Sequence, residues 1–154
     1  MPTYAVGERW TAAKAQELAD LIEESTVSAN STSDSGTVTT TETTTMTLVA
    51  PLENGKTYQI SAYARISSSV AADVVVTRIR LTNSSGTQIQ GGQVECSTTS
   101  TTGYSNSLYT EYTASATGDQ TFVFTIVRGG GTGNIIHRAA STAPGYLVCR
   151  LKQG

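Results

Sequence analysis

The sequence predicts a mainly β fold: an antiparallel, jelly-roll-like β-sandwich of about eight strands, with one N-terminal α-helix. Three observations predict it. Apolar and polar residues alternate along most of the chain after residue 36, which is the pattern of half-buried strands. Turn sequences such as Asn54-Gly55 and Pro144-Gly145 separate the alternating segments. Helical periodicity is convincing in one segment, and a chain of 154 residues has the length of one domain.

The helix is predicted over residues 12–24. Thr11 precedes it and offers a side-chain oxygen as an N-cap. Leu18, Leu21 and Ile22 recur at helical spacing with Ala15, so these four side chains share one face. A helix of about four turns is marginal by itself in water. Its apolar face must therefore dock, either on its own sandwich or on a neighbouring subunit.

The front of the chain is therefore predicted to make assembly contacts. Residues 1–9 are interpreted as an extended arm, because Pro2 and Gly7 disfavour helix. The residues expected to make these contacts are Tyr4, Trp10, Leu18, Leu21 and Ile22. The predicted organisation is an arm and docking helix over residues 1–25, a polar, low-complexity linker over 26–36 and the β-sandwich domain over 37–154.

Short alternating segments supply the predicted strands of the sandwich. Residues 122–127 are the strongest core candidate, and residues 37–41 are a polar edge candidate. A bulge or bend is expected at Gly91-Gly92. The remaining predicted strands cover residues 46–49, 58–66, 73–81, 88–96, 108–113, 134–138 and 146–151.

Composition excludes several classes of partner. The net charge is −2 and the isoelectric point is near 5.3, whereas nucleic-acid binding requires clustered cations. No segment has the length and apolar character of a membrane span, and no secretion signal follows Met1. We therefore expect no nucleic-acid partner, no membrane partner, and synthesis in a cytoplasm.

Candidate catalytic groups are few and scattered. His137 is the only histidine, no Gly-x-Ser-x-Gly elbow is present, and the favoured interpretation of His137 is a surface or edge residue. Glycosidase chemistry requires two carboxylates close together, and Glu95 and Glu111 could be cross-strand neighbours. The loop of residues 129–133 (GGGTG) lacks the lysine of a phosphate loop. We expect no enzyme activity, no catalytic residue and no cofactor.

The two cysteines, Cys96 and Cys149, complete this search. One histidine and two distant cysteines do not have zinc-ligand spacing, so no metal site is expected. In a reducing compartment the default is two buried free thiols. A disulfide between them stays open, because sequence alone cannot establish the pairing.

Tyrosines are the one feature compatible with ligand binding. The candidate glycan contacts are Tyr104, Tyr109 and Tyr112, since sugars stack on exposed rings. The alternatives are that these rings stabilise the sheet as cross-strand pairs or contact another protein.

Three segments resemble small virion proteins of tailed phages that infect actinobacteria. Residues 4–13 (YAVGERWTAA) resemble their opening phrase, residues 52–58 (LENGKTY) their first hairpin, and residues 144–148 (PGYLV) their closing strand. The resemblance implies a structural protein of the virion surface, made in the bacterial host cytoplasm and decorating the capsid. It also implies contact with the major capsid protein or tail proteins, and a homo-oligomer, with a trimer favoured. A minor tail protein, or a carbohydrate-binding module for host attachment, is the alternative.

Overall fold

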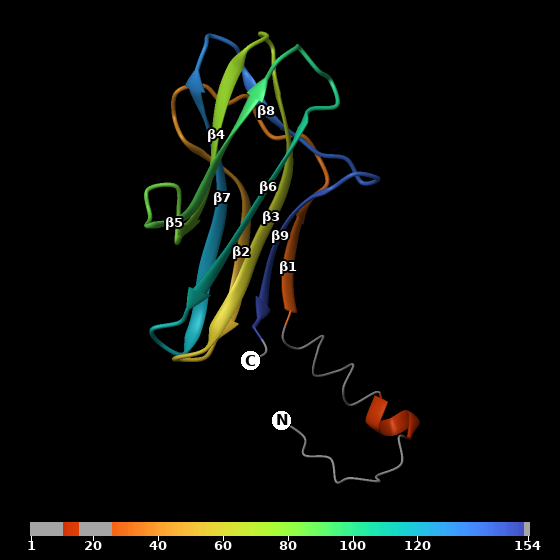
Figure 1. Ribbon diagram of the computed structural model, residues 1–154, viewed down its shortest axis with the longest axis vertical. Helices are drawn as coiled ribbons and strands as arrows, with labels where there is room; N and C mark the ends of the chain where they lie inside the picture. The colour runs from red at the N-terminus through yellow and green to blue at the C-terminus, as the bar shows by residue number, and fades with distance from the viewer. Residues whose placement is uncertain (1–10, 16–25, 153–154) are drawn as a thin grey trace.

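The computed structural model describes residues 11–15 and 26–152. Two antiparallel sheets pack face to face (Figure 1), so the predicted β-sandwich is confirmed. Nine strands occur in the described part of the chain: β1 (Thr26–Ser31), β2 (Thr43–Leu52), β3 (Thr57–Ser68), β4 (Asp73–Leu81), β5 (Gln88–Cys96), β6 (Tyr104–Thr113), β7 (Gly118–Gly130), β8 (Ile135–Arg138) and β9 (Gly145–Leu151).

The connectivity alternates between the two sheets. One sheet has the order β1-β9-β3-β6, with β8 paired to β3, and the other has the order β2-β7-β4-β5. Consecutive strands mostly cross from one layer to the other, which is the connectivity of a jelly roll. We call the first the five-stranded sheet and the second the four-stranded sheet.

The helix is described over a single turn, residues 12–15. Thr11 caps it as predicted, because its Oγ1 accepts a hydrogen bond from the Lys14 N–H at 3.3 Å. The rest of the predicted helix lies outside the described residues, and so do all five predicted assembly contacts: Tyr4, Trp10, Leu18, Leu21 and Ile22. Within the described ranges, no helix has the length and apolar character needed to cross a membrane.

The predicted linker over residues 26–36 is wrong for residues 26–31, while residues 32–36 form no strand. Thr26–Ser31 is strand β1, which pairs with β9 from Thr26↔Arg150 to Ser31↔Gly145. Its side chains are small, and only Val27 and Ala29 pack against the core. Backbone pairing with β9 defines this strand, and side-chain bulk contributes little to it.

Two further predictions are corrected. Residues 37–41 are not an edge strand, because only Val38 forms an isolated bridge, to Ile135. The irregularity in β5 lies at Ile89, since Ile79 pairs with Gln90 and Arg80 pairs with Gln88. Gly91 and Gly92 continue the regular ladder instead of forming the predicted bulge.

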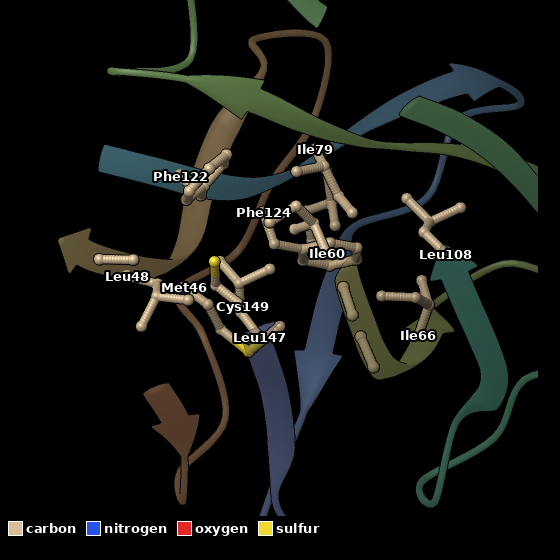
Figure 2. Close-up of a cluster of buried hydrophobic side chains, with 14 of the residues drawn as sticks. Met46, Leu48, Ile60, Ile66, Ile79, Leu108, Phe122, Phe124, Leu147 and Cys149 are labelled. Carbon is tan, nitrogen blue, oxygen red and sulfur yellow. The ribbon is translucent and has the colours of Figure 1, made fainter. Parts of the chain in front are cut away.

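The core lies between the sheets (Figure 2). Phe122, Phe124 and Ile126 of β7 are fully buried, which confirms that strand as the centre of the core. They meet Ile60 and Leu147 from the opposite sheet. Burial of these large apolar side chains, each contributing roughly 1.5–3 kcal/mol, supplies most of the driving force for folding.

Candidate binding surface

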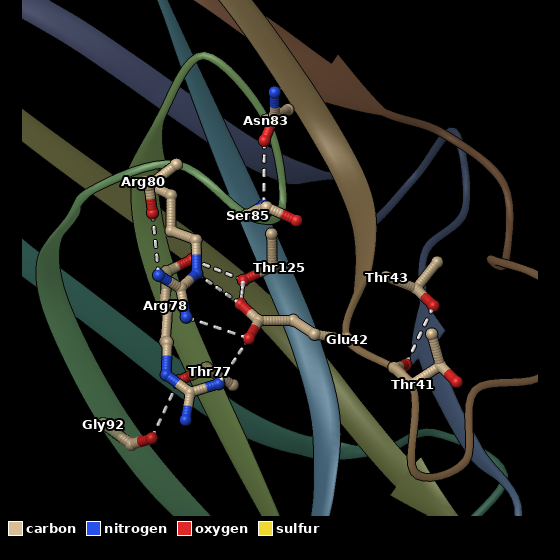
Figure 3. Close-up of polar contacts among 11 residues, drawn as sticks. Thr41, Glu42, Thr43, Thr77, Arg78, Arg80, Asn83, Ser85, Gly92 and Thr125 are labelled. Carbon is tan, nitrogen blue, oxygen red and sulfur yellow. Dashed lines mark hydrogen bonds and ion pairs between the residues drawn. The ribbon is translucent and has the colours of Figure 1, made fainter.

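Among the described residues, the carboxylate with the most side-chain hydrogen bonds is Glu42, which precedes β2 and lies on the outer side of the four-stranded sheet (Figure 3). Its oxygens accept hydrogen bonds from Arg78 at 2.7 Å, from Arg80 at 2.6 and 3.0 Å, and from the Thr125 hydroxyl. Burial alone would raise the pKa of Glu42, but the hydrogen bonds from Arg80 and Thr125 and the charge of Arg78 lower it overall. The Glu42 carboxylate therefore has a structural role, because its oxygens are bonded to side chains of the four-stranded sheet.

The glycine-rich loop between β7 and β8 packs around the carboxylate of Asp73. The Asp73 side chain is buried and accepts hydrogen bonds from the Ser68 hydroxyl and from the backbone N–H groups of Thr132 and Gly133, at 3.0 and 2.9 Å. The Ser68 hydrogen bond is the largest cause that holds the pKa of Asp73 below its ordinary value. The loop therefore binds a carboxylate of its own chain.

His137 is buried, so its interpretation as a surface residue is wrong. It lies in β8 with no exposed area, and its ring meets the Phe124 ring edge-on at 6.1 Å between centroids. Neither ring nitrogen has a hydrogen-bond partner among the described residues. Burial lowers the pKa of His137 from 6.5 to about 4, so the ring is neutral at pH 7.

The two cysteines form no disulfide, and Glu95 and Glu111 lie in different sheets. Cys96 and Cys149 are free and buried, as the default interpretation predicted. Burial raises the pKa of both thiols, that of Cys149 to about 11. Glu95 pairs with Val74 in the four-stranded sheet, whereas Glu111 lies in the five-stranded sheet, so the two carboxylates are not cross-strand neighbours. No metal-binding group of three or more His, Cys, Asp or Glu side chains occurs in the part of the chain that the structure describes.

The three predicted glycan contacts do not share a face. Tyr104 and Tyr112 are partly buried and pack against the core, where the Tyr112 ring meets Phe122 edge-on at 5.5 Å. The Tyr104 hydroxyl also fixes the preceding loop through hydrogen bonds with Thr98. Only Tyr109 faces outward, with 51% of its area exposed. Whether any of them contacts a glycan stays a prediction.

The outer face of the five-stranded sheet carries three tyrosines of the described chain, Tyr63, Tyr109 and Tyr146. The strand register aligns its outward side chains in three rows that cross β1, β9, β3 and β6. The first row is Asn30, Tyr146, Tyr63 and Ser107; the second is Ser28, Val148, Ser61 and Tyr109; the third is Thr26, Arg150, Gln59 and Glu111. In β1, β9 and β3 the second row therefore has the smaller side chains Ser28, Val148 and Ser61, while in β6 it ends in the large Tyr109.

This alternation of size produces a hollow of about 320 Å³, which we call the sheet hollow. It is lined by Thr26, Gln59, Ser61, Tyr109, Val148 and Arg150. Tyr63 and Tyr146 in the adjacent row stack on each other, with ring centroids 5.4 Å apart and an interplanar angle of 24°. On the other side Arg150 donates to the Gln59 amide oxygen at 2.6 Å.

A second hollow, of about 420 Å³, lies at the end of the sandwich where β2 turns into β3. Its lining includes Val27, Leu52, Tyr58 and Leu151, and it is continuous with the core. Val27 belongs to β1, the strand that directly follows the N-terminal segment.

Comparisons with known proteins give a distant likeness only. No protein-family model and no curated protein sequence matches the chain. Among solved structures, a Clostridium thermocellum xylanase fragment with a CBM22-1 module, complexed with xylohexaose, matches 85% of this chain and 27% of its own at 12% identity, with a TM-score of 0.40. The infectious bursal disease virus VP2 subviral particle matches 84% of this chain and 38% of its own at 16% identity, also at 0.40. A structure described as a CBM4 matches 84% of this chain and 92% of its own chain at 16% identity, with a TM-score of 0.33. Likeness at this level carries no argument about function.

Proposed function

We propose that this protein is a non-catalytic structural protein of a phage virion that decorates the capsid surface. In this proposal the N-terminal segment attaches the protein to the particle, and the jelly roll is displayed outward. The partners are the major capsid protein and further copies of this chain, with a trimer favoured.

One observation carries the proposal. His137 and both thiols lie in the core, and the Asp73 and Glu42 carboxylates are bonded to their own chain. The outer face of the five-stranded sheet presents tyrosine, hydroxyl and amide groups together with Arg150 and Glu111, and such groups are suited to binding other molecules.

Two further arguments support a virion role. The jelly roll is a fold that capsid domains and lectin domains both use, so it suits display and binding. The resemblance of residues 4–13, 52–58 and 144–148 to small virion proteins of actinobacterial phages concerns sequence alone and is independent of the fold.

Copy number tests the proposal. Particles released from cells that carry the gene are purified, and the ratio of this chain to the major capsid protein is measured by quantitative mass spectrometry. We expect a copy number comparable to that of the capsid subunit. A few copies per particle would overturn decoration in favour of a minor tail protein, and absence from washed particles would end the virion proposal.

A further inference from the structure

We propose that the sheet hollow binds a segment of a polysaccharide through stacking on Tyr109 and Tyr146 and hydrogen bonds to Ser61, Gln59 and Arg150. This rests on the proposed function only in that a displayed domain exposes this face. The residues differ from the predicted set, because Tyr109 alone belongs to both.

The shape of the hollow fits a short, narrow ligand. Its floor is the middle row, where Ser61 and Val148 lie side by side in paired strands. The Tyr63–Tyr146 stack borders one side and the Arg150–Gln59 pair borders the other. Its volume of about 320 Å³ lies at the lower end of the roughly 300–1,000 Å³ of small-ligand sites.

The lining combines the two kinds of group that a sugar ring requires. A pyranose ring has apolar C–H faces and a rim of hydroxyls. Tyr109 in the lining and Tyr146 in the adjacent row are 51% and 40% exposed, so both rings have apolar area available for the C–H faces. The Ser61 hydroxyl, the Gln59 amide and the Arg150 guanidinium supply donors and acceptors for the rim, and the Gln59 contact uses only one of the five guanidinium N–H groups.

The rings are held in place before any ligand arrives. The Tyr63 hydroxyl is hydrogen-bonded to Ser105 at 3.1 Å, and its ring supports Tyr146 by stacking. The Tyr109 carbonyl accepts a hydrogen bond from Gln90 at 2.6 Å, and its hydroxyl donates to Glu111 at 3.3 Å. Because the site is pre-organised on sheet strands, little conformational entropy is lost on binding.

The small apolar area of the hollow favours a sugar over a protein. The nearby Glu111 is paired with Lys152 at 2.9 Å, and Arg150 is bonded to a neutral amide, so the charge of the site is compatible with neutral and with acidic sugars. Stable protein interfaces bury about 800 Å² per partner around an apolar centre. In the lining of the sheet hollow the aliphatic side chain is that of Val148, which is half-buried and lies among residues with hydroxyl groups.

The test uses the full-length chain on a printed array of neutral and acidic oligosaccharides, followed by calorimetric titration with the strongest binder. Tyr109→Ala removes a stacking ring, and Ser61→Phe fills the hollow while leaving every ring in place. We expect each variant to weaken binding by about tenfold or more. Val49→Ala is the matched control, because Val49 is 50% exposed on the other sheet, and it should bind like the wild type.

Melting curves of all variants establish that they are folded. Wild-type binding to no oligosaccharide on the array, or binding that survives both variants, would overturn the proposal. Virion copy number, measured separately, distinguishes the two proposals. If the protein is found on particles but binds no glycan, only the decoration proposal stands. If it binds a glycan but is absent from particles, only the proposal of glycan binding at the sheet hollow stands.

Discussion

The Gly133 backbone lies against the Asp73 carboxylate, and its N–H donates to Oδ2 at 2.9 Å. A Cβ at position 133 would collide with that carboxylate and with the Ser68 hydroxyl. Asp73 opens β4 and Gly133 precedes β8, so this contact ties together two strands of different sheets. The glycines of this loop are required by a buried anion that belongs to the same chain.

Replacing Gly133 with alanine should therefore destabilise the fold. Forcing a methyl group into this closed space should lower the free energy of unfolding by about 1–3 kcal/mol. Urea denaturation followed by circular dichroism measures the change. Gly36→Ala is the matched control, since nothing lies within 4 Å of a Cβ at that position. Equal stability of the two variants would contradict the close contact at Asp73.

Stability should decrease with acidification between about pH 6.5 and pH 4, because His137 is buried and neutral. The unfolded chain takes up a proton near pH 6.5, whereas burial lowers the folded pKa to about 4. The unfolded state thus binds more protons in this interval, so stability is lost as the pH falls. At about pH 5 the expected loss is about 2 kcal/mol relative to pH 7.5.

The measurement is urea denaturation of wild type and His137→Leu at both pH values. Since His137 is the only histidine, the variant should lose most of this pH dependence. A variant with an unchanged pH dependence would show that another group titrates.

Glu42 should matter far more for stability than Glu111, although both are paired with cations. The Glu42 and Arg80 side chains are 18% and 17% exposed, whereas the Glu111 and Lys152 side chains are 40% and 43% exposed. Glu42→Gln leaves Arg78 and Arg80 without their carboxylate, so we expect a loss of about 1–2 kcal/mol in unfolding free energy. Glu111→Gln should unfold at nearly the wild-type urea concentration, because water solvates both partners. Equal effects of the two changes would refute the structural role of Glu42.

Much of the sandwich could be predicted because its central strands combine bulky side chains with period two. The segments that became β3 and β4 alternate between buried and more exposed side chains, whereas β7 is buried on both faces from Phe122 to Ile126. β1 could not be predicted this way. Its residues are small and polar, and only the backbone pairing with β9, distant in sequence, makes it a strand.

The same limit applies to the candidate site. Tyr63 and Tyr146 are far apart in the sequence and meet because β3 pairs with β9 in one particular register. Tyr104 and Tyr112 are close to Tyr109 in the sequence, yet strand alternation turns them toward the core. Local sequence could indicate which residues alternate. It could not indicate which strands become neighbours, and that decides the composition of a sheet face.

Deleting residues 1–25 should leave a folded sandwich that no longer assembles. The described core contains side chains from both sheets, beginning at Val27, and residues 11–15 contribute no side chain to it. We expect the truncated protein to retain its circular dichroism spectrum and cooperative unfolding, but to lose the oligomeric mass of the full chain in light scattering. Leu18→Asp with Leu21→Asp in the full-length chain is the matched variant, because it changes the predicted apolar face without shortening the chain. A truncated protein that fails to fold would place the N-terminal segment in its own core. A folded, truncated protein of unchanged oligomeric mass would place the assembly contacts on the sandwich itself.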